Sequence, residues 1–314
     1  MKKGVVLVLC ISLLLLVACG TVPQGETASD TSSAANAVKI GTQGVTLTPH
    51  PSLPPRQIWD QNELVAVVEI QNKGNHHITP NSCYVSVTGF DPSIIKGNFQ
   101  PRDCTENTAG TFDGKTLYNI EGTTNQIEFK SSDITLPGKV LKLDQPLLFS
   151  TCYNYQTTAS PSICIDPVFY QISKQEKVCQ ARDVSGGGGQ GGPVGVSYVN
   201  VDMPGGKAFF EITIRNFGNG QVLSPFSDIR TCGLGGIDYT EEDKVAYNVD
   251  LSGASLISCT PGDGIVRLTN GQGKIFCTFD IQGTTAYISP LLVDLNYNYR
   301  QSIKKQLEII KTPE

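Results

Sequence analysis

Cysteine is the residue type in this chain with the most versatile chemistry, since it can bind metals, act as a nucleophile or form disulfides. The sequence contains ten cysteines, and eight remain when Cys10 and Cys19 near the N-terminus are set aside. No C-x-x-C pair is present, and only Cys83 follows closely after a histidine, His77. Zinc sites need such spacings, whereas an even number of cysteines is typical of the disulfide framework of an exported chain. The sequence therefore predicts disulfides, with no metal or other cofactor.

The pairing of the eight cysteines is predicted from their neighbours along the chain. Cys259 and Cys277 flank the turn at Asn270-Gly271 among apolar residues, and they form the first predicted pair. The other predicted pairs are Cys83–Cys104, Cys152–Cys164 and Cys179–Cys232. If all eight cysteines pair, one bridge must join the two halves of the chain. Eight cysteines allow 105 connectivities, so other pairings stay open.

Other residues with metal-binding or catalytic chemistry give weaker signals. His76 and His77 are adjacent, so in an extended segment they point to opposite faces and chelate one ion poorly. Residues 238–243 (DYTEED) are acidic enough for calcium, but the EF-hand spacing is absent and we expect a solvated loop. No G-x-S-x-G motif occurs, and no cysteine lies beside a base. We expect no catalytic residue and no metal ligand.

Exposed aromatic side chains could provide a stacking platform for glycans. Trp59, Tyr84, Tyr153 and Tyr155 are the candidates. Strand alternation places Tyr153 and Tyr155 in the core, and Trp59 is expected to pack at the end of a sandwich.

The N-terminal segment predicts export. Two lysines precede an apolar stretch at residues 5–18, which is shorter than the roughly 20 apolar residues of a membrane-spanning helix. The segment ends in Ala18-Cys19-Gly20, which resembles the lipobox of prokaryotic lipoproteins. In that family the cysteine carries the lipid and begins the mature chain. The resemblance implies a signal peptide over residues 1–18, lipid attachment at Cys19 and a position on the outer face of the cell membrane.

Two pairs of matching segments in the remaining chain share one spacing. Residues 65–75 match residues 209–219, and both segments end in Asn-x-Gly-Asn. Residues 146–155 match residues 290–299, and the offset is 144 positions in both cases. Two matches at one offset predict a duplicated domain.

Within each copy the apolar residues recur at every second position, which predicts strands with one buried face. In the second copy Leu291, Val293, Leu295, Tyr297 and Tyr299 fall on one face. Turn signals rich in Gly, Asn and Pro separate short strands throughout, and residues 301–311 are predicted to form a final strand. This pattern is typical of antiparallel β-sandwiches.

Composition places the boundaries between the predicted parts. The predicted fold is all-β, with two tandem immunoglobulin-like antiparallel β-sandwich domains after a signal peptide and a flexible tether. Residues 19–37 are rich in Ser and Thr and form the disordered tether. The Gly-rich residues 183–193 form an interdomain linker, in which residues 185–193 are not expected to form a regular element. The first sandwich covers residues 38–182 and the second covers residues 194–312.

The strand that leads into Asn-x-Gly-Asn, at residues 67–75 and 211–219, resembles the CARDB-like and related immunoglobulin-like repeats of prokaryotic, notably archaeal, surface proteins. The resemblance implies a role in adhesion or in a surface scaffold. The eight cysteines depart from the family's usual pattern and indicate a disulfide-bearing relative.

The net charge and the charge content limit the classes of binding partner that we expect. The formal net charge is −5 and only 17% of the residues are charged, so the basic stripe of a nucleic-acid-binding protein is not expected. We expect a non-enzymatic, lipid-anchored cell-surface protein that acts as an adhesion, spacer or envelope-scaffold module, with surface proteins or glycans as partners. The alternatives are a solute- or glycan-binding lipoprotein and a hydrolase that acts on polysaccharides.

Overall fold

Alternation of apolar and polar residues produces strands that bury one face. In β13 (Lys207–Asn216) every second side chain is buried, namely Ala208, Phe210, Ile212 and Ile214. β19 (Tyr287–Ile310) buries alternate residues in the same way along most of its length. The predicted all-β antiparallel fold is confirmed, and the predicted strand at the C-terminal end is part of β19.

The computed structural model describes residues 38–97, 99–108, 110–171 and 176–313. These described residues belong to one compact unit. In these described residues no helix has both the length and the hydropathy to span a membrane. The predicted signal peptide (residues 1–18), lipid attachment at Cys19 and tether (residues 19–37) lie outside the described residues.

Strands of very different lengths follow one another along the described chain, and two 3₁₀ turns lie between β14 and β15. The first half contains β1 (Val45–Pro49), β2 (Gln57–Trp59), β3 (Val65–Asn72), β4 (Cys83–Thr88), β5 (Ile95–Lys96), β6 (Arg102–Asp103), β7 (Thr124–Lys130), β8 (Asp133–Ile134), β9 (Lys142–Ala159) and β10 (Ser162–Ile165). The second half contains β11 (Val184–Ser185), β12 (Val194–Asp202), β13, β14 (Gln221–Leu223), η1 (Cys232–Leu234), η2 (Tyr239–Glu241), β15 (Lys244–Leu251), β16 (Ala254–Thr260), β17 (Ile265–Arg267), β18 (Gln272–Ile281) and β19.

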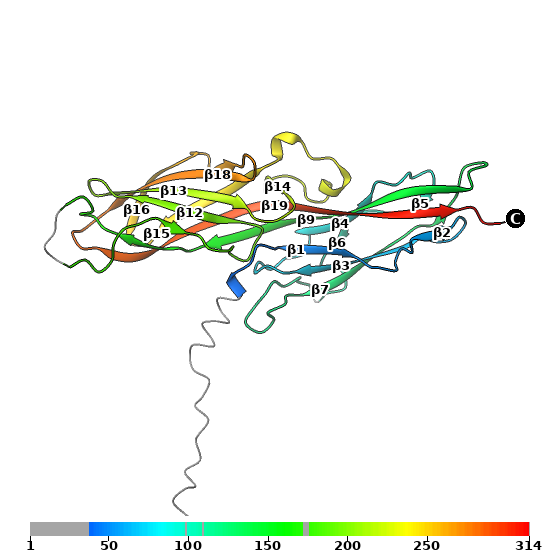
Figure 1. Cartoon of the computed structure of the whole chain (residues 1–314), viewed down its shortest axis with the longest axis horizontal. Helices are drawn as coiled ribbons and strands as arrows, with labels where there is room; N and C mark the ends of the chain where they lie inside the picture. Colours follow the sequence, from blue (N-terminus) through cyan, green and yellow to red (C-terminus); the bar gives the residue numbers. More distant parts are fainter. Residues whose placement is uncertain (1–37, 98, 109, 172–175, 314) are drawn as a thin grey trace, which may run out of the picture. The chain divides into compact units, whose positions relative to one another are not determined.

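In the described part of the chain these strands form four sheets (Figure 1). The largest has the strand order β17-β15-β19-β9-β4-β6, and β2, β10 and β14 also pair with β19. A three-stranded sheet, β1-β3-β7, and a five-stranded sheet, β11-β12-β13-β18-β16, supply the opposite layers, and a small β5-β8 pair completes the set. All three large sheets contribute buried side chains to one continuous hydrophobic core.

The centre of the largest sheet is a long ladder between β9 and β19, which Figure 1 shows side by side. All 18 residues of β9 pair with β19. Asn154 faces Asn298, its counterpart at the offset of 144, and Tyr153 and Tyr155 face Tyr299 and Tyr297. Because equivalent strands pair antiparallel around equivalent asparagines, the two copies have a local two-fold relationship along this ladder.

This ladder makes the largest sheet continuous across the two copies. β4 of the first copy pairs with β9, and β15 of the second copy pairs with β19, so each long strand pairs with a strand of its own copy as well as with the other long strand. Residues 38–182 and residues 194–312 therefore contribute to one sheet and to one core.

The Gly-rich residues 183–193 differ from the predicted linker. Val184–Ser185 forms β11 and pairs with β12, so of the residues 185–193 that were predicted to lack regular structure, Ser185 belongs to a strand. The Gly191 carbonyl accepts hydrogen bonds from the Asn75 amide (2.9 Å) and the Tyr155 hydroxyl (3.1 Å). The glycines allow this close approach, because a Cβ at Gly191 would overlap the Asn75 side chain.

The two Asn-x-Gly turns have equivalent surroundings. The Asn72 amide nitrogen donates to the His76 carbonyl at 2.8 Å, and that of Asn216 donates to the Gly220 carbonyl at 3.0 Å. The asparagine oxygen in each turn accepts from the amide two residues later. Asparagine is needed because its side chain replaces backbone partners within the turn.

A tyrosine hydroxyl contacts each turn from the central ladder. The His76 amide donates to Tyr155 at 3.2 Å, and the Gly220 amide donates to Tyr299 at 2.7 Å. A Cβ at Gly74 would overlap the Tyr155 hydroxyl, so this close approach requires glycine. Burial raises the pKa of Tyr155 well above its ordinary value, which keeps its hydroxyl protonated.

Candidate functional site

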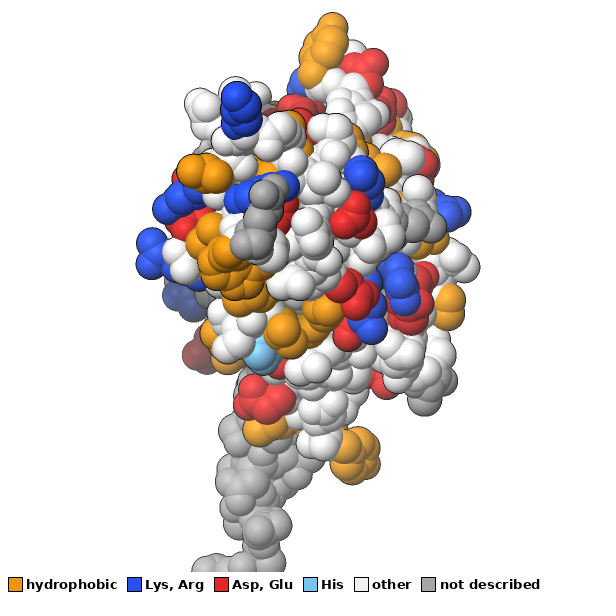
Figure 2. Space-filling view, turned by 90° about the vertical axis from the view of Figure 1, so that its right-hand side faces the viewer, with side chains coloured by type: hydrophobic (Ala, Val, Ile, Leu, Met, Phe, Trp, Pro, Cys, Tyr) orange, Lys and Arg blue, Asp and Glu red, His pale blue; other side chains and the backbone are white. Residues whose placement is uncertain are grey.

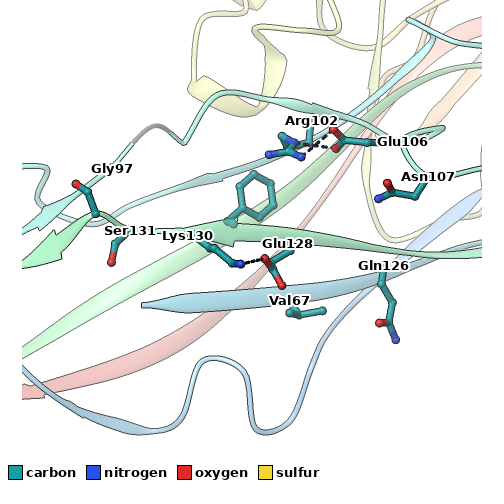
Figure 3. A pocket seen from close by; sticks show the side chains of 11 residues that line it. Val67, Gly97, Arg102, Glu106, Asn107, Gln126, Glu128, Lys130 and Ser131 are labelled. Atoms are coloured by element: carbon teal, nitrogen blue, oxygen red, sulfur yellow. Dashed lines mark hydrogen bonds and ion pairs between the residues drawn. The ribbon is translucent and has the colours of Figure 1, made fainter. Parts of the chain in front are cut away.

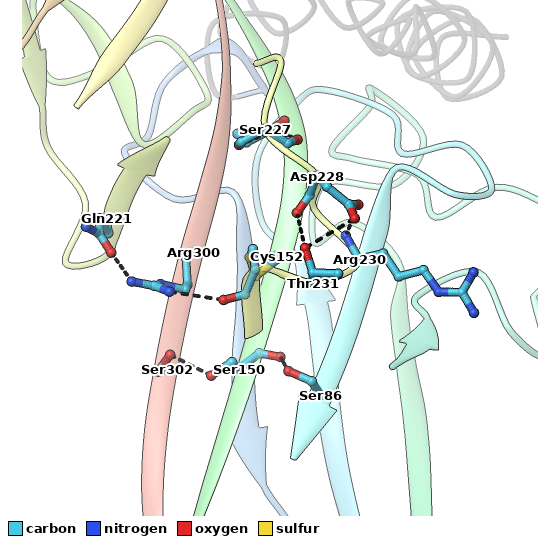
Figure 4. Close-up of a disulfide and its surroundings, with 12 residues drawn as sticks. Ser86, Ser150, Cys152, Gln221, Ser227, Asp228, Arg230, Thr231, Arg300 and Ser302 are labelled. Atoms are coloured by element: carbon cyan, nitrogen blue, oxygen red, sulfur yellow. Dashed lines mark hydrogen bonds between the residues drawn. A yellow bond between two sulfur atoms is a disulfide. The ribbon is translucent and has the colours of Figure 1, made fainter. Parts of the chain in front are cut away.

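A disulfide braces the junction of the two copies on the face of the sheet opposite the main core (Figure 4). Cys152 on β9 bonds to Cys232 at the start of η1, with 6.2 Å between their Cα atoms and 80 positions between them in sequence. The two cysteines and Leu223 form a separate small hydrophobic cluster, against which Ile229 and Ile237 pack. The bridge therefore fixes a second-copy segment onto a first-copy strand.

Hydrogen bonds hold the same segment to the sheet (Figure 4). The Arg300 guanidinium donates to the Cys232 carbonyl at 3.0 Å and also contacts the Gln221 side chain. The Asn298 amide nitrogen donates to the Ser227 carbonyl at 2.9 Å. This combination of a disulfide and charge-assisted hydrogen bonds holds the junction rigidly.

The remaining disulfides confirm part of the predicted pairing and correct the rest. Cys83–Cys104 and Cys259–Cys277 are confirmed, with Cα separations of 5.3 and 4.2 Å. The predicted pairs Cys152–Cys164 and Cys179–Cys232 were wrong, because Cys164 bonds to Cys179 and Cys152 bonds to Cys232. The expectation that one bridge joins the two halves is confirmed.

Strand register explains the correction. Cys152 lies opposite Arg300 of β19, whereas Cys164 lies opposite Ile288 of the same strand. Twelve residues of extended strand separate those positions, which is about 40 Å. A disulfide needs Cα atoms within about 7 Å, so Cys152 and Cys164 cannot meet.

An open groove runs beside β7 in the first copy (Figure 3). It has a volume of about 1080 Å³, comparable to the volume of ligand-binding clefts. Its lining comes from Val67, Gly97, Arg102, Glu106, Asn107, Gln126 and residues 128–132. β7 is a sheet edge, because β3 is its one strand partner among the described residues.

The charges in this groove neutralise one another. Arg102 donates to both carboxylate oxygens of Glu106, at 2.7 and 2.8 Å. Lys130 lies 2.6 Å from a Glu128 oxygen. These hydrogen bonds raise the pKa values of Arg102 and Lys130, so both stay protonated and neither can act as a base at neutral pH. The groove can bind through hydrogen bonds, and it carries no net charge from these four residues.

A second surface feature lies on the outer face of the five-stranded sheet. Phe209 and Phe276 are 39% and 48% exposed there, although both are large apolar side chains. A hollow of about 260 Å³ beside them is also lined by Asn200 and Glu211. Aromatic faces beside planar polar groups can stack against and hydrogen-bond a sugar ring.

His76, His77 and the acidic loop make hydrogen bonds and packing contacts within the chain. His77 lies 3.0 Å from the Asp113 carboxylate, whereas His76 packs edge-on against the Tyr155 ring at 5.1 Å. Burial lowers the pKa of His76. In the loop at 238–243 the Asp238 carboxylate accepts from the Thr240 amide and caps η2. No cluster of three or more His, Cys, Asp or Glu residues suited to a metal ion is present in the described ranges.

The aromatic residues proposed as a glycan platform do not lie together on the surface. Tyr153 and Tyr155 are buried, as predicted. Trp59 on β2 is 46% exposed, and Tyr84 lies beneath the Arg230 guanidinium, whose central carbon is 6.0 Å from the ring centroid. The exposed pair Phe209 and Phe276 was missed, although Phe209 shares its alternation phase with Glu211, which is a readable signal of an outward face.

One end of this unit is seen in Figure 2. Basic and acidic side chains are interspersed on it, and hydrophobic side chains form a group beside a histidine. No field of a single charge sign covers this face, which agrees with the modest net charge of −5.

In comparisons with known proteins, no family model matches the chain, and no curated protein matches it in sequence.

Proposed function

We propose that this chain is a non-enzymatic, lipid-anchored cell-surface protein that acts as a rigid spacer or envelope-scaffold module and presents its outer faces to surface proteins or glycans. The observation that carries the proposal is the β9–β19 ladder with its Cys152–Cys232 brace. Two copies joined by a flexible linker would bend, whereas a shared sheet and a disulfide resist bending. Such a unit is suited to hold a binding surface at a fixed distance.

Anchoring rests on the sequence around Cys19 and on its resemblance to the lipobox. Two acyl chains are sufficient for stable membrane attachment, whereas one is marginal. Resemblance to CARDB-like repeats supports an adhesive or scaffolding role. The all-β fold favours this proposal over a solute-binding lipoprotein built from two α/β lobes.

The test combines localisation with capture on intact cells. The wild-type protein is expected in the membrane fraction, accessible to added protease, and Cys19→Ser is expected to lose membrane attachment. Crosslinking on intact cells should then capture a distinct surface protein or glycan. A wild-type protein that is found free inside the cell, or one that turns over a polysaccharide or ester substrate, would contradict the proposal.

Glycan binding is the second candidate, and the exposed Phe209 and Phe276 favour it. Stacking on these rings, with sugar hydroxyls that hydrogen-bond the Asn200 amide and donate to the Glu211 carboxylate, is the interaction that would hold a sugar. A glycan array should show binding that Phe276→Ala weakens at least tenfold. Phe226→Ala is the matched control, since Phe226 is exposed but lies outside this hollow.

A further inference from the structure

Only every second residue of β7 forms backbone hydrogen bonds with β3, and the register shows which residues these are. The Ser131 amide donates to the Leu64 carbonyl at 2.9 Å, and the Asn72 amide donates to the Thr123 carbonyl at 3.0 Å. In an antiparallel pair, hydrogen-bonded residues alternate with residues whose N–H and C=O point away. The odd-numbered residues of β7 therefore bond to β3, and the backbone groups of Gln126, Glu128 and Lys130 point to the open edge.

These outward groups line the groove beside β7. The Gln126 amide is occupied, because it donates to its neighbour Asn125 at 2.8 Å. Among the described residues, the amides of Glu128 and Lys130 have no hydrogen-bond acceptor. An unpaired strand edge of this kind is a template for another strand.

In the second copy, the strand edge that corresponds to the open edge of β7 is paired with another strand. Val65 pairs with Lys130 in the first copy, and its counterpart Phe209 pairs with Thr278 in the second. Thr278 pairs on its other side with Ser258 of β16. The second copy thus covers this edge with its own strand, and the described first copy has no strand there.

Flanking segments limit what can enter the groove. At one end the Ser132 amide donates to the Lys96 carbonyl at 2.7 Å. At the other end the Asn125 side chain donates to the carbonyls of Cys104 (2.9 Å) and Glu106 (2.5 Å). The edge is therefore recessed between two segments. A single extended chain fits this recess, whereas the edge of a second sheet would meet the flanks.

We propose that this groove binds an extended peptide segment of another protein, which adds to β7 as a further strand. The segment pairs with the backbone of Glu128 and Lys130, in the position that β16 occupies against β18. It is uncharged, because the ion pairs Arg102–Glu106 and Glu128–Lys130 leave no net charge to complement. This binding mode goes beyond the spacer role and depends neither on the lipid anchor nor on glycan binding.

The probe for this proposal is a synthetic peptide with the sequence of β16, residues 254–260, in which serine replaces Cys259. Amide hydrogen exchange is measured on the folded protein with and without the peptide. The amides of Glu128 and Lys130 are expected to exchange at least tenfold more slowly with the peptide, and a scrambled peptide is expected to have no effect. The absence of protection at both amides would overturn the proposal.

Two further experiments, one with variants of the protein and one with modified peptides, distinguish strand addition from other modes of peptide binding. Glu128→Pro removes an amide that faces the groove and spares the ladder to β3, so it should fold and lose at least tenfold in peptide affinity. Glu128→Ala keeps the amide and should bind within about threefold of wild type. Peptides N-methylated at the amides that face β7 should fail to bind, and peptides N-methylated at the amides that face away from β7 should bind. Equal binding by Glu128→Pro and Glu128→Ala, or by both methylated series, would refute strand addition.

Discussion

At the scale of residues, the asparagine of each turn, which is buried at Asn72 and half-buried at Asn216, explains why Asn-x-Gly recurs at the offset of 144. Its side chain satisfies backbone groups that the turn removes from the ladder, and a tyrosine from the central strands completes the cluster. The motif thus has the same structural role in both turns.

Asn72→Ala should lower the free energy of unfolding by about 2 kcal/mol, because it removes the side-chain donor to the His76 carbonyl and one of the two donors to the Phe112 carbonyl. Urea denaturation measures this change. Asn219→Ala is the control, since Asn219 is exposed, and it should change stability by less than about 0.5 kcal/mol. Equal effects of the two substitutions would contradict the assigned role.

The buried carboxylate of Asp60, which contacts Lys311 and Thr312 at the end of the chain, makes stability depend on pH. The Lys311 ammonium lies 2.8 Å from Asp60, and together with the Thr312 amide it lowers the pKa of Asp60 from 3.8 to about 2. The folded pKa lies below the unfolded value, so this stabilisation is present above about pH 4 and is lost as the pH falls towards 2. Urea denaturation between pH 6 and pH 2 should show the loss in wild type.

Asp60→Asn is the matched variant for this titration. It should be less stable than wild type at pH 6, and the difference should shrink as the pH falls towards 2. A difference that stays constant over this range would rule out Asp60 as the titrating group.

At the scale of elements, alternation and turn signals predicted the strands and their buried faces. They did not predict which strands pair with each other. The alternation in residues 291–299 identifies the buried face of β19, and it also places Cys152 on the opposite face. It does not say which strand lies beside β19, because every neighbour in a sheet satisfies the same alternation. The groove beside β7 was not predicted for a related reason, since an unpaired strand edge has the same sequence pattern as a paired one.

The Cys152–Cys232 disulfide closes the longest loop of the four, at 80 residues. Replacing both cysteines with serine should cost about 4.5 kcal/mol, because the unfolded chain gains the entropy of that loop. Replacing Cys164 and Cys179, which are 15 positions apart, should cost about 3 kcal/mol. Thermal and urea unfolding of the two double variants give the comparison, and a larger loss for the shorter loop would contradict it.

At the scale of the whole molecule, the central claim is that the two copies fold as one cooperative unit. They share the β9–β19 ladder and a continuous core, so opening one copy removes partners from the other. Tandem domains joined through a flexible linker would instead unfold with separate stabilities.

Native-state hydrogen exchange in increasing urea tests this claim most directly. The slowest amides of β3 in the first copy and of β13 in the second should converge on one free energy of opening. The convergence should persist in the double variant that lacks the Cys152–Cys232 bridge, because the ladder rather than the disulfide couples the copies. Two opening free energies that differ by more than about 1 kcal/mol at all urea concentrations would contradict the account.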